Sequence, residues 1–161
     1  MYKSVLLAYD SSIEGAKALR EGALLARRCG ADVFLLSVVP RSADVQMAEG
    51  TFAGIVVGQT DSYKALLSRA VARLTDLGMK PRARLLVGEP AAVIGQVARE
   101  IGADLVVVGH RQQTLISRWW FGSTGAYLSD HISCSLLLAR TSISDETFEA
   151  EMRVPAYSAN D

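Results

Sequence analysis

The residues of this sequence best suited to chemistry are Gly122, Ser123 and Thr124, in the stretch FGST. They stand where a helix is expected to begin after a loop. Unpaired backbone N–H groups and the positive end of the helix dipole attract anions there, a glycine lets an anion approach the backbone, and two hydroxyls can donate hydrogen bonds. The stretch therefore indicates a phosphate site. The alternative is that Ser123 or Thr124 only caps the helix.

The better-known phosphate fingerprints are absent from the sequence. It contains no GxxxxGK[ST] motif and no GxGxxG after the first predicted strand. Without the lysine of the first motif, the usual point charge on the terminal phosphates is missing. The phosphate hypothesis therefore depends on where the predicted strands and helices place the FGST stretch.

Short aliphatic runs predict the strands. Their hydrophobicity is nearly continuous rather than alternating, which is typical of strands covered on both faces in a parallel sheet. These runs are residues 4–9, 32–39, 82–88, 104–109 and 135–139.

Helical patterns lie between the runs. The clearest one has apolar side chains at the i, i+3, i+4 and i+7 positions of one face and is followed by Gly78. The predicted helices are 12–29, 61–77, 90–101 and a fourth from about Gly122 to Cys134. With right-handed crossovers, this alternation predicts an α/β domain over residues 1–140. Its fold is an open, doubly wound, five-stranded parallel sheet with helices on both faces.

The expected strand order, 3-2-1-4-5, predicts where a ligand crevice lies. In open α/β sheets, ligands bind beyond the carboxyl ends of the strands, where the strand order reverses. For this order, that point lies between the first strand, which ends near residues 8–10, and the fourth, which ends at 108–109. The FGST stretch follows the fourth strand, so it is attached to the predicted crevice.

Composition excludes several classes of partner. The chain has 17 Lys and Arg against 17 Asp and Glu, so no overall charge favours nucleic acid or a membrane surface. No segment approaches the roughly 18 apolar residues of a membrane span, and no secretory signal is visible. We therefore expect a cytoplasmic protein. Cys29 and Cys134 form no CxxC motif, and we expect both to be buried free thiols.

Two segments stand outside the regular alternation. Residues 40–58 form a long connection with an apolar patch, which is either a lid or a loop folded onto the sheet edge. Residues 141–161 form a polar C-terminal extension. Within it, Ser144 is placed to cap a short helix in which Phe148 and Met152 share a face.

The spacing around the loop is similar to a known signature. Gly109, position 112, Gly122 and Ser123 follow the pattern G-x2-G-x9-G-[ST] of nucleotide-binding universal stress proteins, with Gln112 in place of the second glycine. The resemblance extends from YKSVLLAYDSS to CSLLLAR, nearly the whole domain. The chain therefore resembles the universal stress protein family.

The resemblance implies an adenine nucleotide, ATP or AMP, with Mg²⁺ at Asp10 as a further option. Asp10 has a second interpretation, because Asp-Ser-Ser before a helix is also a capping sequence. The implied contacts are Ala8, Tyr9 and Asp10 on the base and ribose side, Val38 or Val39 beside adenine, Val108 and Gly109 closing the crevice, and Gly122, Ser123 and Thr124 on the phosphates. Arg111 either reaches a phosphate or is a solvated loop residue.

Gln112 departs from the family pattern and leaves more than one function open. Its side chain would crowd the place where family members bring backbone against the phosphates. The first hypothesis is a nucleotide-binding regulator of stress responses, and the second is a nucleotide-independent interaction protein with an unknown protein partner. The third is an enzyme, a slow ATPase or an adenylyl transferase, although no general base with a partner, no nucleophile constellation and no carboxylate pair is visible in the sequence.

The last predicted strand, 135–139, has the sequence SLLLA. The family resemblance implies a homodimer through this strand. Unpaired, it would be an exposed apolar sheet edge.

Overall fold

The structure is a computed structural model, and it describes residues 1–10, 12–40, 53–109, 128 and 130–154. Strands and helices alternate from the first strand to the fourth. The described elements are β1 (Ser4–Ala8), α1 (Ile13–Cys29), β2 (Asp32–Pro40), α2 (Ala53–Asp76), β3 (Arg82–Gly88), α3 (Pro90–Glu100), β4 (Leu105–Gly109), β5 (Ser135–Ala139) and α5 (Asp145–Arg153).

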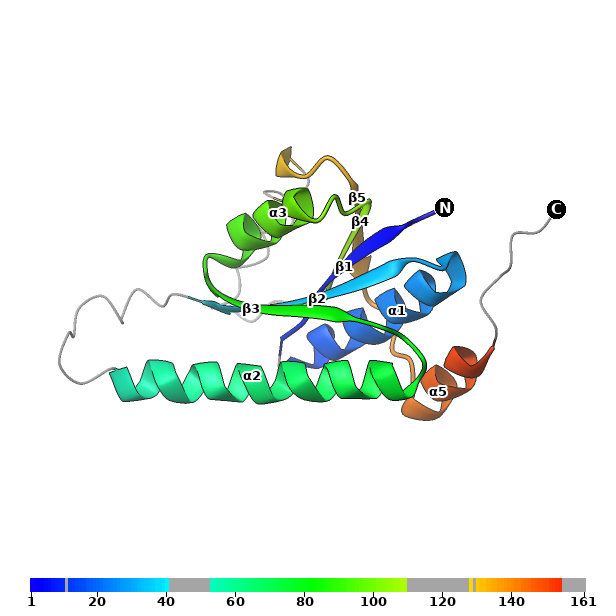
Figure 1. The fold of residues 1–161 in the computed structure, drawn as a ribbon, viewed down its shortest axis with the longest axis horizontal. Coiled ribbons are helices and arrows are strands. Elements are labelled where there is room, and N and C mark those ends of the chain that lie inside the picture. The colour runs from blue at the N-terminus through cyan, green and yellow to red at the C-terminus, as the bar shows by residue number, and fades with distance from the viewer. Residues whose placement is uncertain (11, 41–52, 110–127, 129, 155–161) are drawn as a thin grey trace.

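The strands form one parallel sheet in the order β3-β2-β1-β4-β5. The predicted order and fold class are thereby confirmed. β1 lies in the centre, where Val5 is in register with Val33 of β2 and Leu105 of β4. In Figure 1, α1, α2 and α5 lie on one face of the sheet and α3 on the other.

Both faces of the central strands are buried, which explains their continuous hydrophobicity. Val5 and Leu7 belong to the apolar cluster that packs under α1 and α2, and Leu6 belongs to the cluster under α3. Close packing against the sheet also constrains α1. A Cβ on Gly22 would lie 2.3 Å from a methyl group of Leu7, so a larger residue there would push the helix away.

Local signals in the sequence set the ends of the helices. Ser12 caps α1 by accepting a hydrogen bond from the Gly15 N–H at 2.9 Å, and Gly30 ends that helix with a φ of 63°. Glu89 caps α3 by accepting from the Ala92 N–H at 2.7 Å, and Pro90 occupies its first turn.

The start of α2 differs from the prediction. The helix begins at Ala53, eight residues before the predicted 61, so residues 53–58 belong to it and not to the expected connection 40–58. The sequence AGIVVGQT has glycines and β-branched residues of weak helix propensity. Extending a formed helix adds one hydrogen bond for each residue, which outweighs that weak preference. Of the expected lid or loop, residues 41–52 lie outside the described residues.

The fourth predicted helix is only partly described. Leu128, Asp130 and His131 are helical, whereas Ile132 to Cys134 are not, so the helix ends before the predicted Cys134. The chain must turn there, because the Ser135 N–H bonds the Asp104 carbonyl at 3.1 Å at the start of β5. Cys134 and Cys29 are free thiols as predicted, but both are only partly buried.

The C-terminal segment contains the predicted short helix. Ser144 caps α5 by accepting from the Thr147 N–H at 3.1 Å. Phe148 and Met152 lie on one face, and each is only 1% exposed. Both side chains belong to the cluster under α1 and α2, so α5 completes the apolar core of that face.

No described helix is both long and apolar enough to span a membrane.

Candidate functional site

Three of the predicted crevice residues come together on the α3 face of the sheet. Val38 and Val108 are 9% and 7% exposed, and Ala8 packs against the same apolar cluster. They come from the carboxyl ends of β2, β4 and β1, which are neighbouring strands. These side chains form an apolar wall at the place where the strand order reverses.

Tyr9 and Val39 are directed differently. Side chains alternate along a strand, so Val39 points away from the face that Val38 occupies. The Tyr9 side chain packs against the cluster under α1 and α2. The Tyr9 backbone is held at the strand end, because its N–H donates to the Leu36 carbonyl at 2.8 Å and its carbonyl accepts from the Ser37 hydroxyl at 2.6 Å.

Asp10 supports the start of α1. Its Oδ1 accepts hydrogen bonds from the Ser12 N–H, at 2.9 Å, and from the Ser12 hydroxyl. Ser12 is the N-cap itself, so Asp10 orients the capping hydroxyl. Within the described part of the chain, no group donates a hydrogen bond to the other carboxylate oxygen, Oδ2. The two interpretations of Asp10 are therefore compatible, since they use different oxygens.

Gly15 and Gly109 let the first turn of α1 approach the strand ends closely. A Cβ on Gly15 would lie 2.3 Å from Asp10 Oδ1, and one on Gly109 would lie 2.4 Å from the Glu14 carbonyl oxygen. Either contact would force the backbone to shift. The first glycine of the signature is thus required for packing in this chain, whether or not a ligand binds.

Sequence reasoning missed Gly15. Its only signal was a glycine in the first turn of a predicted helix, where the residue weakens the helix unless close packing requires it.

The expected phosphate end of the crevice falls outside the described residues. This applies to Arg111, Gln112, Gly122, Ser123 and Thr124. Among the described residues, no group of three or more His, Cys, Asp or Glu side chains could hold a metal ion. The described part of the site is therefore an apolar wall on the α3 face, with the Asp10 carboxylate at the start of α1 beyond the end of β1.

Comparison with known proteins shows which family this chain is similar to. The universal stress protein family model matches residues 1–140. A putative universal stress protein of Staphylococcus epidermidis is 27% identical over 161 residues, covering 96% of this chain and 93% of that protein. The crystal structure of a universal stress protein family member from Burkholderia pseudomallei is 28% identical, with a TM-score of 0.68, and the match covers 85% of this chain and 95% of that one.

Two similar structures of universal stress proteins contain adenine nucleotides. One is in complex with cAMP, with a TM-score of 0.63, 22% identity, and coverage of 88% of this chain and 98% of that one. The other, from Archaeoglobus fulgidus, is in complex with dAMP, with a TM-score of 0.59, 24% identity, and coverage of 86% and 98%. At these identities, the likeness establishes a common fold. The family match over residues 1–140 goes further, and this chain belongs to the universal stress protein family.

Proposed function

We propose that this protein is a cytoplasmic regulator of stress responses that binds an adenine nucleotide, ATP or AMP, between the ends of β1 and β4. The observation that carries the proposal is the wall of Ala8, Val38 and Val108, together with the Asp10 carboxylate that follows the end of β1. The apolar wall suits a flat base, and the carboxylate suits a ribose hydroxyl. The cAMP and dAMP complexes of similar proteins support this choice of ligand.

Residues 1–140 would form the nucleotide-binding domain and 141–161 its extension. At the phosphate end, Gly122, Ser123 and Thr124 would supply backbone N–H groups and hydroxyls, with Arg111 as an additional donor. Mg²⁺ is usually bound through one or two carboxylates together with phosphate oxygens and water. A single carboxylate at Asp10 fits that pattern, so the metal would arrive with the nucleotide.

The protein would act as a homodimer paired through β5. In the second function, Gln112 closes the crevice and the same dimer presents an interaction surface to another protein. Calorimetric titration of the purified protein with ATP and AMP separates these functions, because the second one requires that neither nucleotide binds.

Asp10→Asn is the sharpest variant for this test. Asparagine keeps an oxygen that can accept from Ser12, but it replaces the available carboxylate oxygen with an amide nitrogen. We expect nucleotide affinity to fall at least tenfold, or about 1.4 kcal/mol, while the thermal midpoint stays close to that of the wild type. Asp76→Asn, at an exposed position at the end of α2, is the matched control. Wild-type affinity in Asp10→Asn would remove Asp10 from the site.

A further inference from the structure

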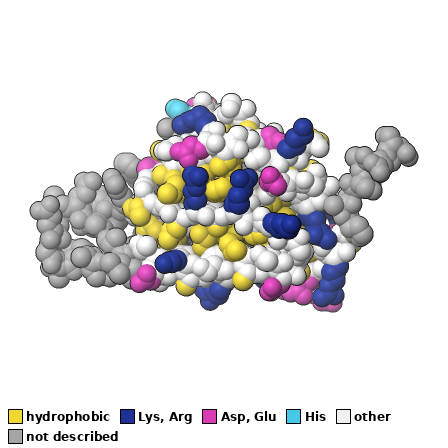
Figure 2. Space-filling model, in the orientation of Figure 1, with side chains coloured by type: hydrophobic (Ala, Val, Ile, Leu, Met, Phe, Trp, Pro, Cys, Tyr) yellow, Lys and Arg dark blue, Asp and Glu magenta, His cyan; other side chains and the backbone are white. Residues whose placement is uncertain are grey.

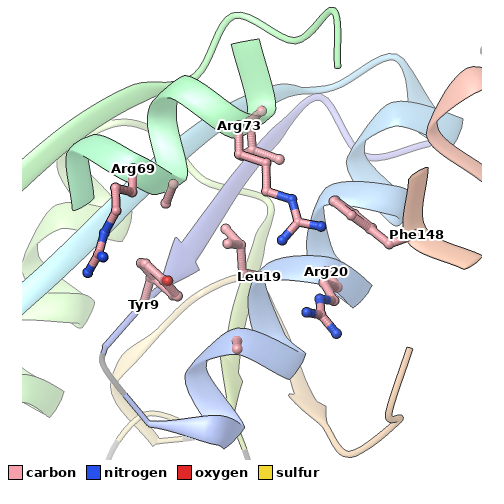
Figure 3. A pocket seen from close by; sticks show the side chains of 9 residues that line it. Tyr9, Leu19, Arg20, Arg69, Arg73 and Phe148 are labelled. Carbon is pink, nitrogen blue, oxygen red and sulfur yellow. The ribbon is translucent and has the colours of Figure 1, made fainter. Parts of the chain in front are cut away.

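A second cavity, of about 150 Å³, lies between α1, α2 and α5. Figure 3 shows Arg69 and Arg73 entering it from α2, Arg20 from α1, Phe148 from α5, and Tyr9 from the end of β1. It is on the face of the sheet opposite the wall formed by Ala8, Val38 and Val108. The cavity is therefore distinct from the proposed nucleotide crevice.

Two of the three arginines are paired with α5. Arg20 and Arg73 each donate to Asp145 Oδ1 at 2.6 Å, and Arg73 also lies 3.6 Å from a Glu149 oxygen. The Arg73 guanidinium lies over the Phe148 ring, 5.4 Å from its centre. The role of Arg20 and Arg73 is therefore to hold α5 in place.

Arg69 does not contact α5 in this way. Across the described residues, its guanidinium has no ion pair and no hydrogen bond. Asp145 and Glu149 pair with Arg20 and Arg73, so neither of these carboxylates is the partner of Arg69. An arginine presents several N–H donors in a plane that suits carboxylate or phosphate oxygens.

Tyr9 adds an unused donor beside Arg69. Its hydroxyl has no hydrogen-bond partner within the described parts of the chain. Burial, and then the charge of Asp10, raise the pKa of Tyr9, whereas the charges of Arg69, Arg73 and Arg20 oppose that rise, with Arg69 the strongest of the three. The phenol is thus protonated at neutral pH and can donate to an oxyanion.

The inner wall of the cavity is apolar. Leu19, Ala70 and Leu74 line it, and all three are buried. This apolar wall keeps water away from one side of a bound group, while Arg69 itself is an exposed residue. The small volume limits the bound group to a few heavy atoms.

We propose that this cavity binds a small oxyanion, either free phosphate or the phosphoryl group of a small metabolite. Arg69 supplies the charge that binds the anion, and Tyr9 donates a hydrogen bond to it. Arg20 and Arg73 remain paired with Asp145 and lie nearby. The proposal does not rest on nucleotide binding at the crevice.

The experiment is a calorimetric titration of the full chain with inorganic phosphate and, separately, with glycerol 3-phosphate, at constant ionic strength. We expect saturable binding of at least one of them. Arg69→Ala should weaken it at least fivefold, Tyr9→Phe should also weaken it, and neither should prevent folding, because neither removed group holds another element in place. Lys64→Ala removes a positive charge from an exposed position on the same helix and should leave the affinity unchanged.

The two ligands distinguish the source of the anion. Tighter binding of glycerol 3-phosphate would indicate a phosphorylated metabolite, and binding of inorganic phosphate alone would indicate the free ion. Phosphate bound elsewhere, including the proposed phosphate end of the crevice, would keep its affinity in Arg69→Ala. That result, or the absence of binding to the wild type, would overturn the proposal.

Discussion

The sheet has two edge strands, β3 and β5, and their side chains differ in charge. Arg82 and Arg84 stand on β3, and their guanidinium groups lie over the ring of Phe34 at 5.6 and 5.4 Å from its centre. Figure 2 shows Lys and Arg side chains among the hydrophobic ones in the band between α2 and α3, where β3 runs. β5, by contrast, contains only Ser, Leu and Ala.

This difference bears on which edge pairs with another chain. Charged side chains on an edge strand discourage pairing with a second strand. The β3 arginines are also fixed in place, since Arg84 donates to Glu100 at 2.9 Å and Arg82 lies 3.8 Å from an Asp32 oxygen. On β5, Leu138 is 39% exposed and has no charged neighbour within its strand. The contrast supports the proposed homodimer through β5 and argues against pairing through β3.

The largest expected effect is loss of the dimer in Leu138→Arg. The substitution places a charge on the edge that the proposed dimer buries, and the exposed position allows the monomer to fold. Sedimentation velocity should show a monomer. Val87→Arg is the matched control, because Val87 is 49% exposed on the other edge. If Val87→Arg dissociated the protein and Leu138→Arg did not, the interface would have to be moved to β3.

A smaller effect is expected when the arginines of β3 are removed. Arg82→Ala combined with Arg84→Ala loses two cation–π contacts, each worth about 0.5–1 kcal/mol at an exposed site. It also leaves an uncharged edge. We expect a lower thermal midpoint and faster aggregation on warming, measured by light scattering. Arg28→Ala, at an exposed ion pair on α1, controls for the loss of a surface charge. Aggregation no faster than in that control would show that the arginines do not protect the edge.

The sequence predicted the two edge strands, but not the contacts that their side chains make. The runs 82–88 and 135–139 predicted β3 and β5 correctly, because short aliphatic runs leave a clear signal even where the strand lies at the edge of the sheet. The position of Arg82 and Arg84 over Phe34 was not predictable, since it depends on the register between β2 and β3. That register places Arg82 beside Phe34 although they are far apart in the sequence.

The same reasoning applies to the two ligand sites. The ends of β1 and β4 could be located from the strand pattern, since topology alone places the crevice. The cavity beside Arg69 is lined by Tyr9, by arginines of α1 and α2 and by Phe148 of α5, which are far apart in sequence. Periodicity identifies the buried face of each helix, but it does not show which polar positions of two helices will meet. For the same reason, the close approach of Gly15 to Asp10 could not be foreseen.

The smallest expected effect is a dependence on pH, which we expect beside the β3 edge but not at the β5 edge. Hydrogen bonds from Gln96 and from Arg84 hold the pKa of Glu100 below its ordinary value of 4.5. A carboxyl group with a lowered folded-state pKa stabilises the fold above its unfolded-state pKa, and that contribution disappears as the pH falls through the folded value. Glu100→Gln should therefore lower the thermal midpoint slightly at neutral pH, and the difference from the wild type should vanish at strongly acidic pH. β5 has no titratable side chain, so the Leu138→Arg effect on assembly should be the same at pH 6 and pH 8. A midpoint difference for Glu100→Gln that persisted in acid would show that the carboxylate charge is not what holds Arg84 on the β3 edge.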